Sequence, residues 1–300
     1  MCGIVGLFSK SFGVSERLGE HLGSMLVELS DRGPDSAGVA LYRDPAHAGA
    51  TKVSLHSPDP RYGWDALHGE LEAAFGATEP DVRASHAVLV VDAEPEAVQE
   101  WLRERRPELR VMSAGRSLEI YKEAGLPRDF VARFGLGDIQ ASHGLGHTRM
   151  ATESAVTTDG SHPFWTGGDL CLVHNGSLSN HNWLRTRLRR EGIEFQTEND
   201  SEVAAGYVTW RLAQGDSLDQ ALERCLGELD GFYTFAVGTA DGFAVLRDPI
   251  ACKPAVMAET EDWVAMASEY RAIAVLPDAE DANVWEPAPA TVYSWERQPV

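Results

Sequence analysis

The sequence predicts an α+β fold in which antiparallel sheets lie between layers of helices. Two observations lead to this prediction: many short apolar runs are separated by turn residues, and several longer segments repeat apolar residues at helical spacing. A third observation adds a small inserted α/β unit, because strand-like and helix-like segments alternate between about residues 84 and 136. A chain of 300 residues, 43% of them hydrophobic, can bury a sizeable core, and we expect one domain over residues 2–300.

A buried strand and an amphipathic helix open the chain. The apolar run Cys2–Phe8 indicates a strand that ends near Ser9, so we expect the N-terminus to be held inside the fold. Apolar residues then recur at helical spacing over residues 15–30, and this helix is predicted to stop at the turn sequence of residues 31–35. Strands around 39–42 and 51–56 resemble an antiparallel meander.

The inserted unit and the segments after it follow from the same patterns. In the unit we expect strands at 87–91 and 110–112 and helices at 95–106, 118–124 and 128–134. After the unit we expect helices at 181–190 and 201–214, and strands at 141–149, 169–174, 231–237, 242–247, 255–258, 263–267 and 291–294.

Charge and composition exclude some classes of function. The formal net charge of −20 argues against binding to a nucleic-acid backbone, because that requires clustered Lys and Arg. The charge fits a basic partner surface, or simply a solvated acidic surface. No leader of signal-peptide type is present, and no apolar run approaches the roughly 18 to 20 residues of a membrane span. We therefore expect a soluble cytoplasmic protein.

The cysteines form no CxxC pair. Cys171, Cys225 and Cys252 lie in apolar runs and are interpreted as buried thiols in a reducing compartment. Cys2 is different because it directly follows Met1. Removal of Met1, which is common when the second residue is small, would place an α-amine beside the thiol. This amine titrates near about pH 7.7 to 8.0, so its neutral form could accept the thiol proton without a separate general base.

Several short motifs follow the Met-Cys-Gly start in a fixed order. They are DRGPDSAG at 31–38, GHTRMAT at 146–152, HPF at 162–164, HNG at 174–176 and NDSE at 199–202. Together with Cys2 they resemble the class II, or N-terminal nucleophile (Ntn), glutamine amidotransferases over residues 2–56 and 140–275. The resemblance implies the four-layer αββα sandwich of the Ntn hydrolases. The chain is similar in particular to stand-alone amidotransferase subunits of glutamate synthase-like and N-methylglutamate synthase-like enzymes.

The resemblance also implies a reaction and its residues. Cys2 would attack the carboxamide of L-glutamine, ammonia would leave, and water would hydrolyse the γ-glutamyl thioester to glutamate. The side-chain amide of Asn175 and the backbone N–H of Gly176 are expected to form the oxyanion hole. Arg149 is expected to bind the α-carboxylate, for which a planar guanidinium is suited, and Asp200 the α-ammonium.

Other residues of the motifs are given supporting parts. Thr152 and His162 are placed among the substrate-binding residues by the resemblance. Arg32, Gly33 and Asp35 are interpreted as structural residues of a turn near the site. No metal site is predicted, because the spacing of His147, His162 and His174 matches no common zinc pattern; from their spacing alone, all three are interpreted as core or loop residues.

Structural alternatives stay open for four of these residues. Arg149 lies on an apolar strand and could be a buried ion-pair partner. Asp200 lies where a helix should begin and could serve as its N-cap. Asn175 and Gly176 together form a good hairpin turn pair, because both residues tolerate positive φ.

Cofactors and partners follow from the same resemblance. The chain shows no glycine-rich phosphate loop in the usual spacing, so no cofactor is expected in it. Free ammonia is lost by protonation and diffusion, and we therefore expect a synthase subunit that receives it through an internal passage. FMN and iron–sulfur clusters are expected, if anywhere, in such partner subunits.

Two other functions remain as alternatives. An Ntn amidase for a neutral amide would not need the charges of both Arg149 and Asp200. A non-catalytic regulatory or scaffold subunit would be expected to lose Cys2, Asn175 or Asp200, all of which are present.

Overall fold

The N-terminal apolar run forms strand β1 (Gly3–Ser9) in the middle of a seven-stranded sheet. The computed structural model describes residues 2–151 and 156–297. Alternate side chains of β1 face opposite ways, as expected for a strand: Leu7 packs among helices, and Ile4 packs against a second sheet. A strand buried on both faces explains why this segment is apolar throughout, and the predicted strand is confirmed.

Two antiparallel sheets form the body of the molecule. In spatial order, the first contains β15 (Asn283–Trp285), β13 (Val256–Glu259), β14 (Trp263–Ala267), β1, β8 (His143–Arg149), β2 (Ser36–Tyr42) and β7 (Leu118–Ala124). The second contains β16 (Thr291–Glu296), β12 (Gly242–Arg247), β11 (Gly231–Gly238), β10 (Leu170–Leu178) and β9 (Phe164–Gly167).

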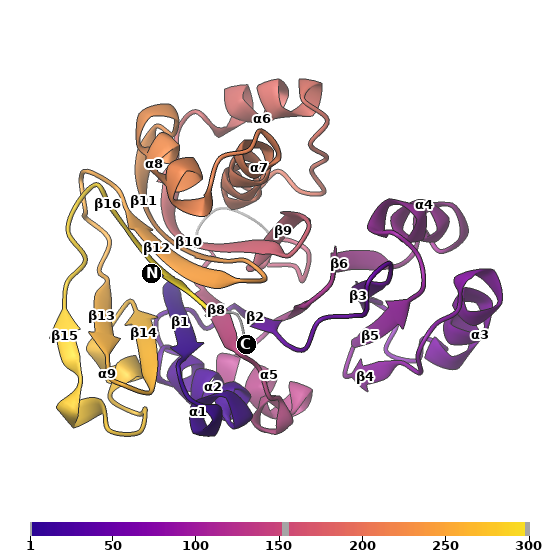
Figure 1. Cartoon of the computed structure of the whole chain (residues 1–300), viewed down its shortest axis with the longest axis horizontal. Helices are drawn as coiled ribbons and strands as arrows, with labels where there is room; N and C mark the ends of the chain where they lie inside the picture. Colours follow the sequence, from indigo (N-terminus) through magenta and orange to yellow (C-terminus); the bar gives the residue numbers. More distant parts are fainter. Residues whose placement is uncertain (1, 152–155, 298–300) are drawn as a thin grey trace.

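Helices cover the outer face of each sheet, so the body has four layers (Figure 1). The first sheet is covered by α1 (Phe12–Glu16), α2 (Leu18–Glu28), α5 (Pro127–Phe134) and α9 (Tyr270–Ile273), with short 3₁₀ turns at Leu136–Asp138 and Ala279–Asp281. The second is covered by α6 (His181–Arg190), α7 (Asp200–Ala213) and α8 (Leu218–Glu228). The αββα sandwich expected from the sequence is confirmed.

The two sheets approach closely at a glycine of β1. A Cβ added to Gly6 would lie 2.4 Å from a ring carbon of Phe243, which belongs to β12 of the other sheet. The ring therefore occupies the space that a side chain at this position would fill. This contact helps to fix the spacing between the sheets.

A third sheet forms the inserted unit, which projects from the body (Figure 1). It contains β4 (Asp81–Arg83), β5 (His86–Val91), β3 (Thr51–His56) and β6 (Arg110–Gly115), with α3 (Trp64–Phe75) and α4 (Pro95–Arg105) packed against it. The unit therefore spans 51–115 rather than the expected 84–136. Strands β2 and β3 belong to different sheets, so the expected meander is wrong.

The segment 118–124 is strand β7 and not the predicted helix. Its residues alternate between two cores: Leu118 and Ile120 face the space between the sheets, and Tyr121 faces the helices. This alternation has the period of a strand. The charged residues of this segment obscured the alternation, because two of them, Glu119 and Lys122, are themselves buried.

Two of the three cysteines predicted to be buried are buried. Burial raises the pKa of the Cys171 thiol to about 12, and Cys225 is also fully enclosed. Cys252 is exposed, contrary to the prediction, because its apolar neighbour Ile250 is itself at the surface with 65% of its area accessible. Within residues 2–151 and 156–297, no helix is both long and apolar enough to cross a membrane.

Candidate functional site

A pocket of about 560 Å³ gathers most of the residues singled out in the sequence. Cys2, Arg149, His162, Gly176 and Asp200 all contribute to its wall. They come from the start of β1, the end of β8, the segment before β9, the middle of β10 and the first residue of α7. Both sheets and one outer helix therefore contribute to a single cavity.

The main chain of Cys2 is held by two side-chain donors. Its carbonyl oxygen accepts hydrogen bonds from Arg32 Nε at 3.2 Å and from Asn175 Nδ2 at 3.3 Å. The guanidinium of Arg32 also forms an ion pair with Glu269. The Cys2 Sγ lies 3.9 Å from the carbonyl oxygen of Met150. The nucleophile candidate is thus fixed at its backbone, while its half-buried side chain reaches the pocket.

The residue after Cys2 is a glycine for a packing reason. A Cβ on Gly3 would lie 2.7 Å from Thr148 Oγ1 and 2.9 Å from a methyl carbon of Leu29. The next residue, Ile4, donates its N–H to Ser268 Oγ at 3.0 Å and accepts the N–H of Ser268 at 2.9 Å. Both contacts hold the start of β1 in place.

The turn at 31–35 supports the strand end that carries Arg149. A Cβ on Gly33 would lie 2.3 Å from the carbonyl carbon of Thr148, so only glycine fits there. Asp35 donates its N–H to the Arg149 carbonyl at 3.0 Å and accepts the N–H of Ala151 on Oδ2 at 2.7 Å. These positions agree with the structural part predicted for the turn.

Arg149 is the last residue of β8, and only 7% of it is exposed. Its Nη1 donates to the carbonyl oxygen of Gly160 at 2.9 Å. Gly160 was not predicted as a site residue, because a carbonyl group is present at every residue and carries no sequence signal. Thr152, predicted to bind substrate, lies outside the described residues.

Asn175 and Gly176 lie within β10 and pair with β11, so the hairpin-turn alternative is wrong. Asn175 is 3% exposed and points its amide at the Cys2 carbonyl. A Cβ on Gly176 would lie 2.0 Å from the carbonyl oxygen of Phe232 and 2.6 Å from His174 Nε2. The strand therefore passes its neighbours too closely for any side chain at this position.

Asp200 is not the N-cap of α7. That position belongs to Asn199, whose Oδ1 accepts the N–H of Ser201 at 2.9 Å. Asp200 Oδ2 instead accepts the N–H of Leu178 at 2.9 Å, and its side chain is 23% exposed at the pocket. A carboxylate at the start of a helix is also favoured by the helix dipole.

A chain of buried polar side chains joins four of the motifs at the wall of the pocket. Ser201 Oγ lies 2.8 Å from His162 Nε2 and 2.8 Å from His174 Nδ1. The ring of His147 stacks on His162 with the centroids 3.9 Å apart, and its Nε2 lies 3.2 Å from the His174 carbonyl oxygen. Ser201 was not predicted as a site residue, although it directly follows Asp200 in the motif at 199–202.

Burial determines the charge state of these histidines. It lowers the pKa of His147 to about 3, and it also lowers the pKa of His162 and of His174. Neutral rings can donate and accept hydrogen bonds at once, as this chain of contacts requires. No cluster of three or more His, Cys, Asp and Glu residues with metal-binding geometry occurs among the described residues.

Known proteins share both the sequence and the fold. Residues 147–275 match the family described as "Glutamine amidotransferase domain". Over 299 residues the chain is 56% identical to the "Glutamine amidotransferase-like protein GlxB" of Rhizobium meliloti (strain 1021), covering 99% of both chains. It is 31% identical over 191 residues to the glutamine–fructose-6-phosphate aminotransferase (isomerizing) of Aquifex aeolicus (strain VF5), covering 61% of this chain and 32% of the relative.

A solved structure shows the same fold at low identity. The glutamine phosphoribosylpyrophosphate amidotransferase from B. subtilis, complexed with ADP and GMP, superposes with a TM-score of 0.62 at 19% identity. The match covers 98% of this chain and 49% of that chain, so this protein spans about half its length. At this identity the likeness establishes the fold.

Proposed function

The chain belongs to the family of class II glutamine amidotransferases, and on that premise we propose that it hydrolyses L-glutamine to glutamate and ammonia through Cys2, after removal of Met1. The observation that carries the proposal is the joint presence of Cys2, Arg149 and Asp200 in one pocket, with the Asn175 amide bonded to the Cys2 carbonyl.

The charges of the pocket fit an amino acid. Glutamine carries a carboxylate and an ammonium group on the same carbon, and Arg149 and Asp200 offer the opposite charges within one cavity. A planar guanidinium can pair with a carboxylate through two parallel hydrogen bonds. A neutral amide substrate has no charged group for either residue to recognise, which favours an amino-acid substrate over the other Ntn amidase chemistry.

The proposed reaction begins at the sulfur atom of Cys2. The free α-amine takes the thiol proton, and the thiolate forms a bond to the carboxamide carbon as its carbonyl electrons move onto oxygen. We assign that oxygen to the Asn175 amide and the Gly176 N–H, which would stabilise its negative charge. The C–N bond then breaks, and ammonia leaves with the proton that the α-amine held. Water cleaves the thioester to glutamate and restores the thiol.

Ammonia from this site would serve a second reaction. In water it is protonated and diffuses away, so we propose that a synthase subunit of the glutamate synthase-like or N-methylglutamate synthase-like type docks near the pocket and receives it. Any FMN or iron–sulfur cluster would belong to that subunit. Purification of the untagged protein from its own cells tests this: a stoichiometric synthase subunit is expected, and purification of the chain alone would contradict it.

The nucleophile can be tested by intact mass spectrometry. The protein is incubated with 6-diazo-5-oxo-L-norleucine, an electrophilic analogue of glutamine, in a Cys252→Ser background, because Cys252 is an exposed second thiol. We expect a chain that lacks Met1 and gains one adduct, and no adduct in the matched Cys2→Ala variant. Retention of Met1, or an adduct that survives Cys2→Ala, would refute the proposal.

A further inference from the structure

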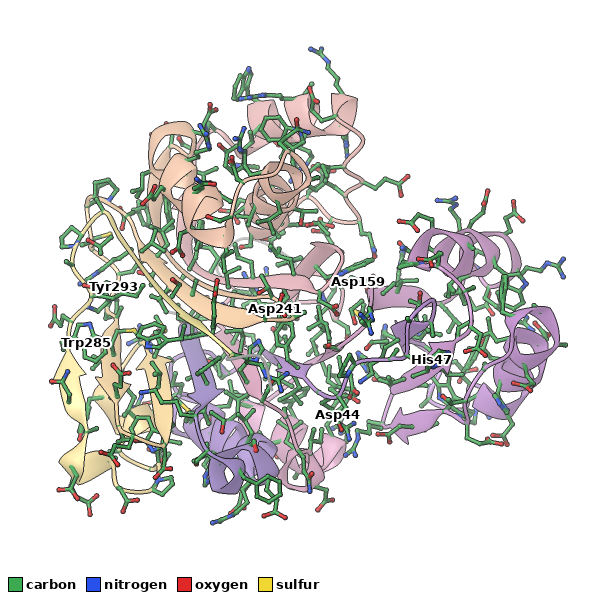
Figure 2. All side chains as sticks on the ribbon, viewed as in Figure 1. Asp44, His47, Asp159, Asp241, Trp285 and Tyr293 are labelled. Atoms are coloured by element: carbon green, nitrogen blue, oxygen red, sulfur yellow. The ribbon has the colours of Figure 1, made fainter. Side chains whose placement is uncertain are left out.

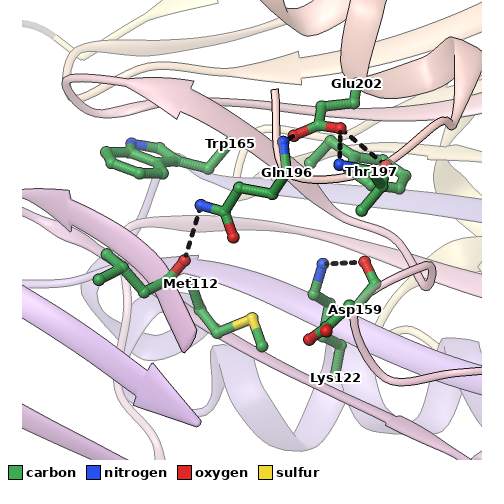
Figure 3. Close-up of a pocket in the computed structure, with 9 residues that line it drawn as sticks. Met112, Lys122, Asp159, Trp165, Gln196, Thr197 and Glu202 are labelled. Carbon is green, nitrogen blue, oxygen red and sulfur yellow. Dashed lines mark hydrogen bonds between the residues drawn. The ribbon is translucent and has the colours of Figure 1, made fainter. Parts of the chain in front are cut away.

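A lysine outside every motif holds one wall of the pocket. Lys122 lies on β7 and is 5% exposed. Its Nζ donates to three main-chain carbonyl oxygens, those of Asp159 at 3.2 Å, Ser161 at 2.9 Å and Pro163 at 3.3 Å. Figure 3 shows the ammonium group of Lys122 bonded to Asp159. Because an ammonium group has three N–H donors, these contacts use its full capacity.

The two residues between these carbonyls, Gly160 and His162, line the pocket. Gly160 accepts the hydrogen bond from Arg149, and His162 lines the pocket and bonds to Ser201. The segment 159–163 thus alternates: every second carbonyl is bound by Lys122, and the residues in between form part of the pocket wall. Fixing one set of groups fixes the other.

The segment also packs tightly against its neighbours. A Cβ on Gly38 of β2 would lie 2.2 Å from the His162 carbonyl oxygen and 2.6 Å from Lys122 Cβ. On its outer side, the carboxylate of Asp159 forms an ion pair with Arg110 of the inserted unit at 3.2 Å. Figure 2 shows Asp159 where the body meets that unit.

Burying an ammonium group is costly, so its partners have to compensate. Two carboxylates act on the Lys122 charge, those of Asp159 and Glu202. The Glu202 carboxylate is occupied by three donors, the N–H groups of Gln196 and Thr197 and the hydroxyl of Thr197 (Figure 3). Removing the ammonium group would leave three carbonyls without this donor, and those of Ser161 and Pro163 are buried.

We propose that Lys122 is a positioning residue for substrate recognition: by fixing the main chain of residues 159–163 it places the Gly160 carbonyl that orients the guanidinium of Arg149. This inference rests on the proposed function, because it takes Arg149 to bind the α-carboxylate of glutamine. It assigns Lys122 no contact with the reacting atoms. Loss of Lys122 should therefore weaken recognition of an amino-acid-shaped molecule while leaving the reactivity of Cys2 in place.

The test compares two reagents on the same thiol. In the Cys252→Ser background, the glutamine analogue needs both Cys2 and the amino-acid-binding groups, whereas iodoacetamide needs only the thiolate. For Lys122→Met we expect the ratio of the analogue rate to the iodoacetamide rate to fall by about tenfold or more. The iodoacetamide rate should stay within about twofold, and Lys122→Gln, which keeps two donors, should give a smaller loss.

A second buried lysine provides the matched control. Lys52 of β3 is 7% exposed and binds Glu119 at 3.1 Å and the Asp44 carbonyl at 2.8 Å, and it does not line the pocket. Lys52→Met should leave the ratio unchanged. An unchanged ratio in Lys122→Met, or an equal fall in Lys52→Met, would overturn the inference. Failure of the parent protein to react with the analogue would instead refute the proposed function.

Titration of Lys122 itself allows a test that needs no substitution at this residue. Burial lowers the pKa of Lys122 to about 8, against the opposing effect of Asp159 and Glu202. The histidines that sense its charge, His56, His86 and His162, have pKa values lowered by burial and stay neutral in this range.

Between about pH 7 and about pH 8.5 the charged fraction of Lys122 falls about fourfold. We expect the ratio of the two rates in the Cys252→Ser protein to fall in parallel, because changes in the Cys2 thiolate affect both reagents. A ratio that stays flat across this range would overturn the inference.

Discussion

Two donors share the carbonyl oxygen of Cys2, and replacing each in turn separates positioning from catalysis. Arg32 Nε and Asn175 Nδ2 lie 3.2 Å and 3.3 Å from this atom. Arg32→Met and Asn175→Ala each remove one of these hydrogen bonds. Only Asn175 is also assigned to the oxyanion hole. If Asn175 merely fixed the main chain of Cys2, the two variants would lose similar amounts of activity.

The expected magnitudes differ for the two effects. Loss of one of two hydrogen bonds to the Cys2 carbonyl should cost about 1 kcal/mol, or about fivefold in rate if it were expressed fully in catalysis. Loss of an oxyanion donor costs about 10²- to 10³-fold in kcat. We therefore expect Asn175→Ala to lower kcat by at least about a hundredfold with little change in KM. Arg32→Met should lower kcat by about tenfold or less.

The assay is glutamate release from L-glutamine, measured with the partner subunit present if activity depends on it. Thermal unfolding of both variants provides the control. Arg32→Met should be the less stable variant, because it also loses the ion pair with Glu269. Equal losses of kcat in the two variants would refute the oxyanion assignment. A raised KM in Asn175→Ala with unchanged kcat would refute it as well.

The remaining predictions concern recognition, packing and pH. Arg149→Lys should raise KM for glutamine by about tenfold, because an ammonium group cannot form the bidentate pair; an unchanged KM would contradict this. Gly6→Ala should destabilise the fold by about 1 to 3 kcal/mol in urea unfolding, because its methyl group would meet the Phe243 ring. Gly13→Ala should not, because a methyl group there would meet nothing within 4 Å beyond its chain neighbours and its own helix backbone. Burial lowers the pKa of His143 to about 3, so the unfolded state binds the extra proton as the pH falls below about 6.5. Wild type should therefore lose about 2 kcal/mol more stability than His143→Gln between about pH 7 and about pH 5, and parallel curves would refute this.

The elements predicted best are strands buried on both faces. β1, β12 and β14 were placed to within about a residue, because apolar residues on both sides of a strand produce one continuous apolar run. The helix at 181–190 was also placed correctly, since one face packs on a sheet and the other carries arginines in water. In these segments the local pattern and the final environment agree.

The inserted unit shows where local pattern fails. Its β3 pairs with β5 and β6, and the chain returns to the first sheet only at β7. Strand pairing over such distances is decided by packing between segments that the sequence does not mark as partners. Helices α3 and α8 were not predicted, because each buries only a narrow apolar stripe.

The motifs predicted which side chains gather at the site but not what holds them there. Cys2, Arg149 and Asp200 line one pocket as the resemblance implied. Their supports are mainly groups without a sequence signal: the carbonyl of Gly160, the hydroxyl of Ser201 and the buried ammonium group of Lys122. A lysine is normally assigned to the surface, and the burial of Lys122 is explained only by the partners that the fold brings to it, three carbonyl oxygens and the nearby carboxylates of Asp159 and Glu202.

The two sheets supply complementary halves of the site. The first provides Cys2 and Arg149, and the second, with the helix packed on it, provides Asn175 and Asp200. At the site, hydrogen bonds cross between the sheets from Asn175 to the Cys2 carbonyl and from His147 to the His174 carbonyl. The distance between nucleophile and oxyanion donor is therefore set by the packing of the inter-sheet core. Substitutions that widen this core should reduce kcat by more than their effect on stability explains, because misplacement of reacting groups by a fraction of an ångström already slows catalysis.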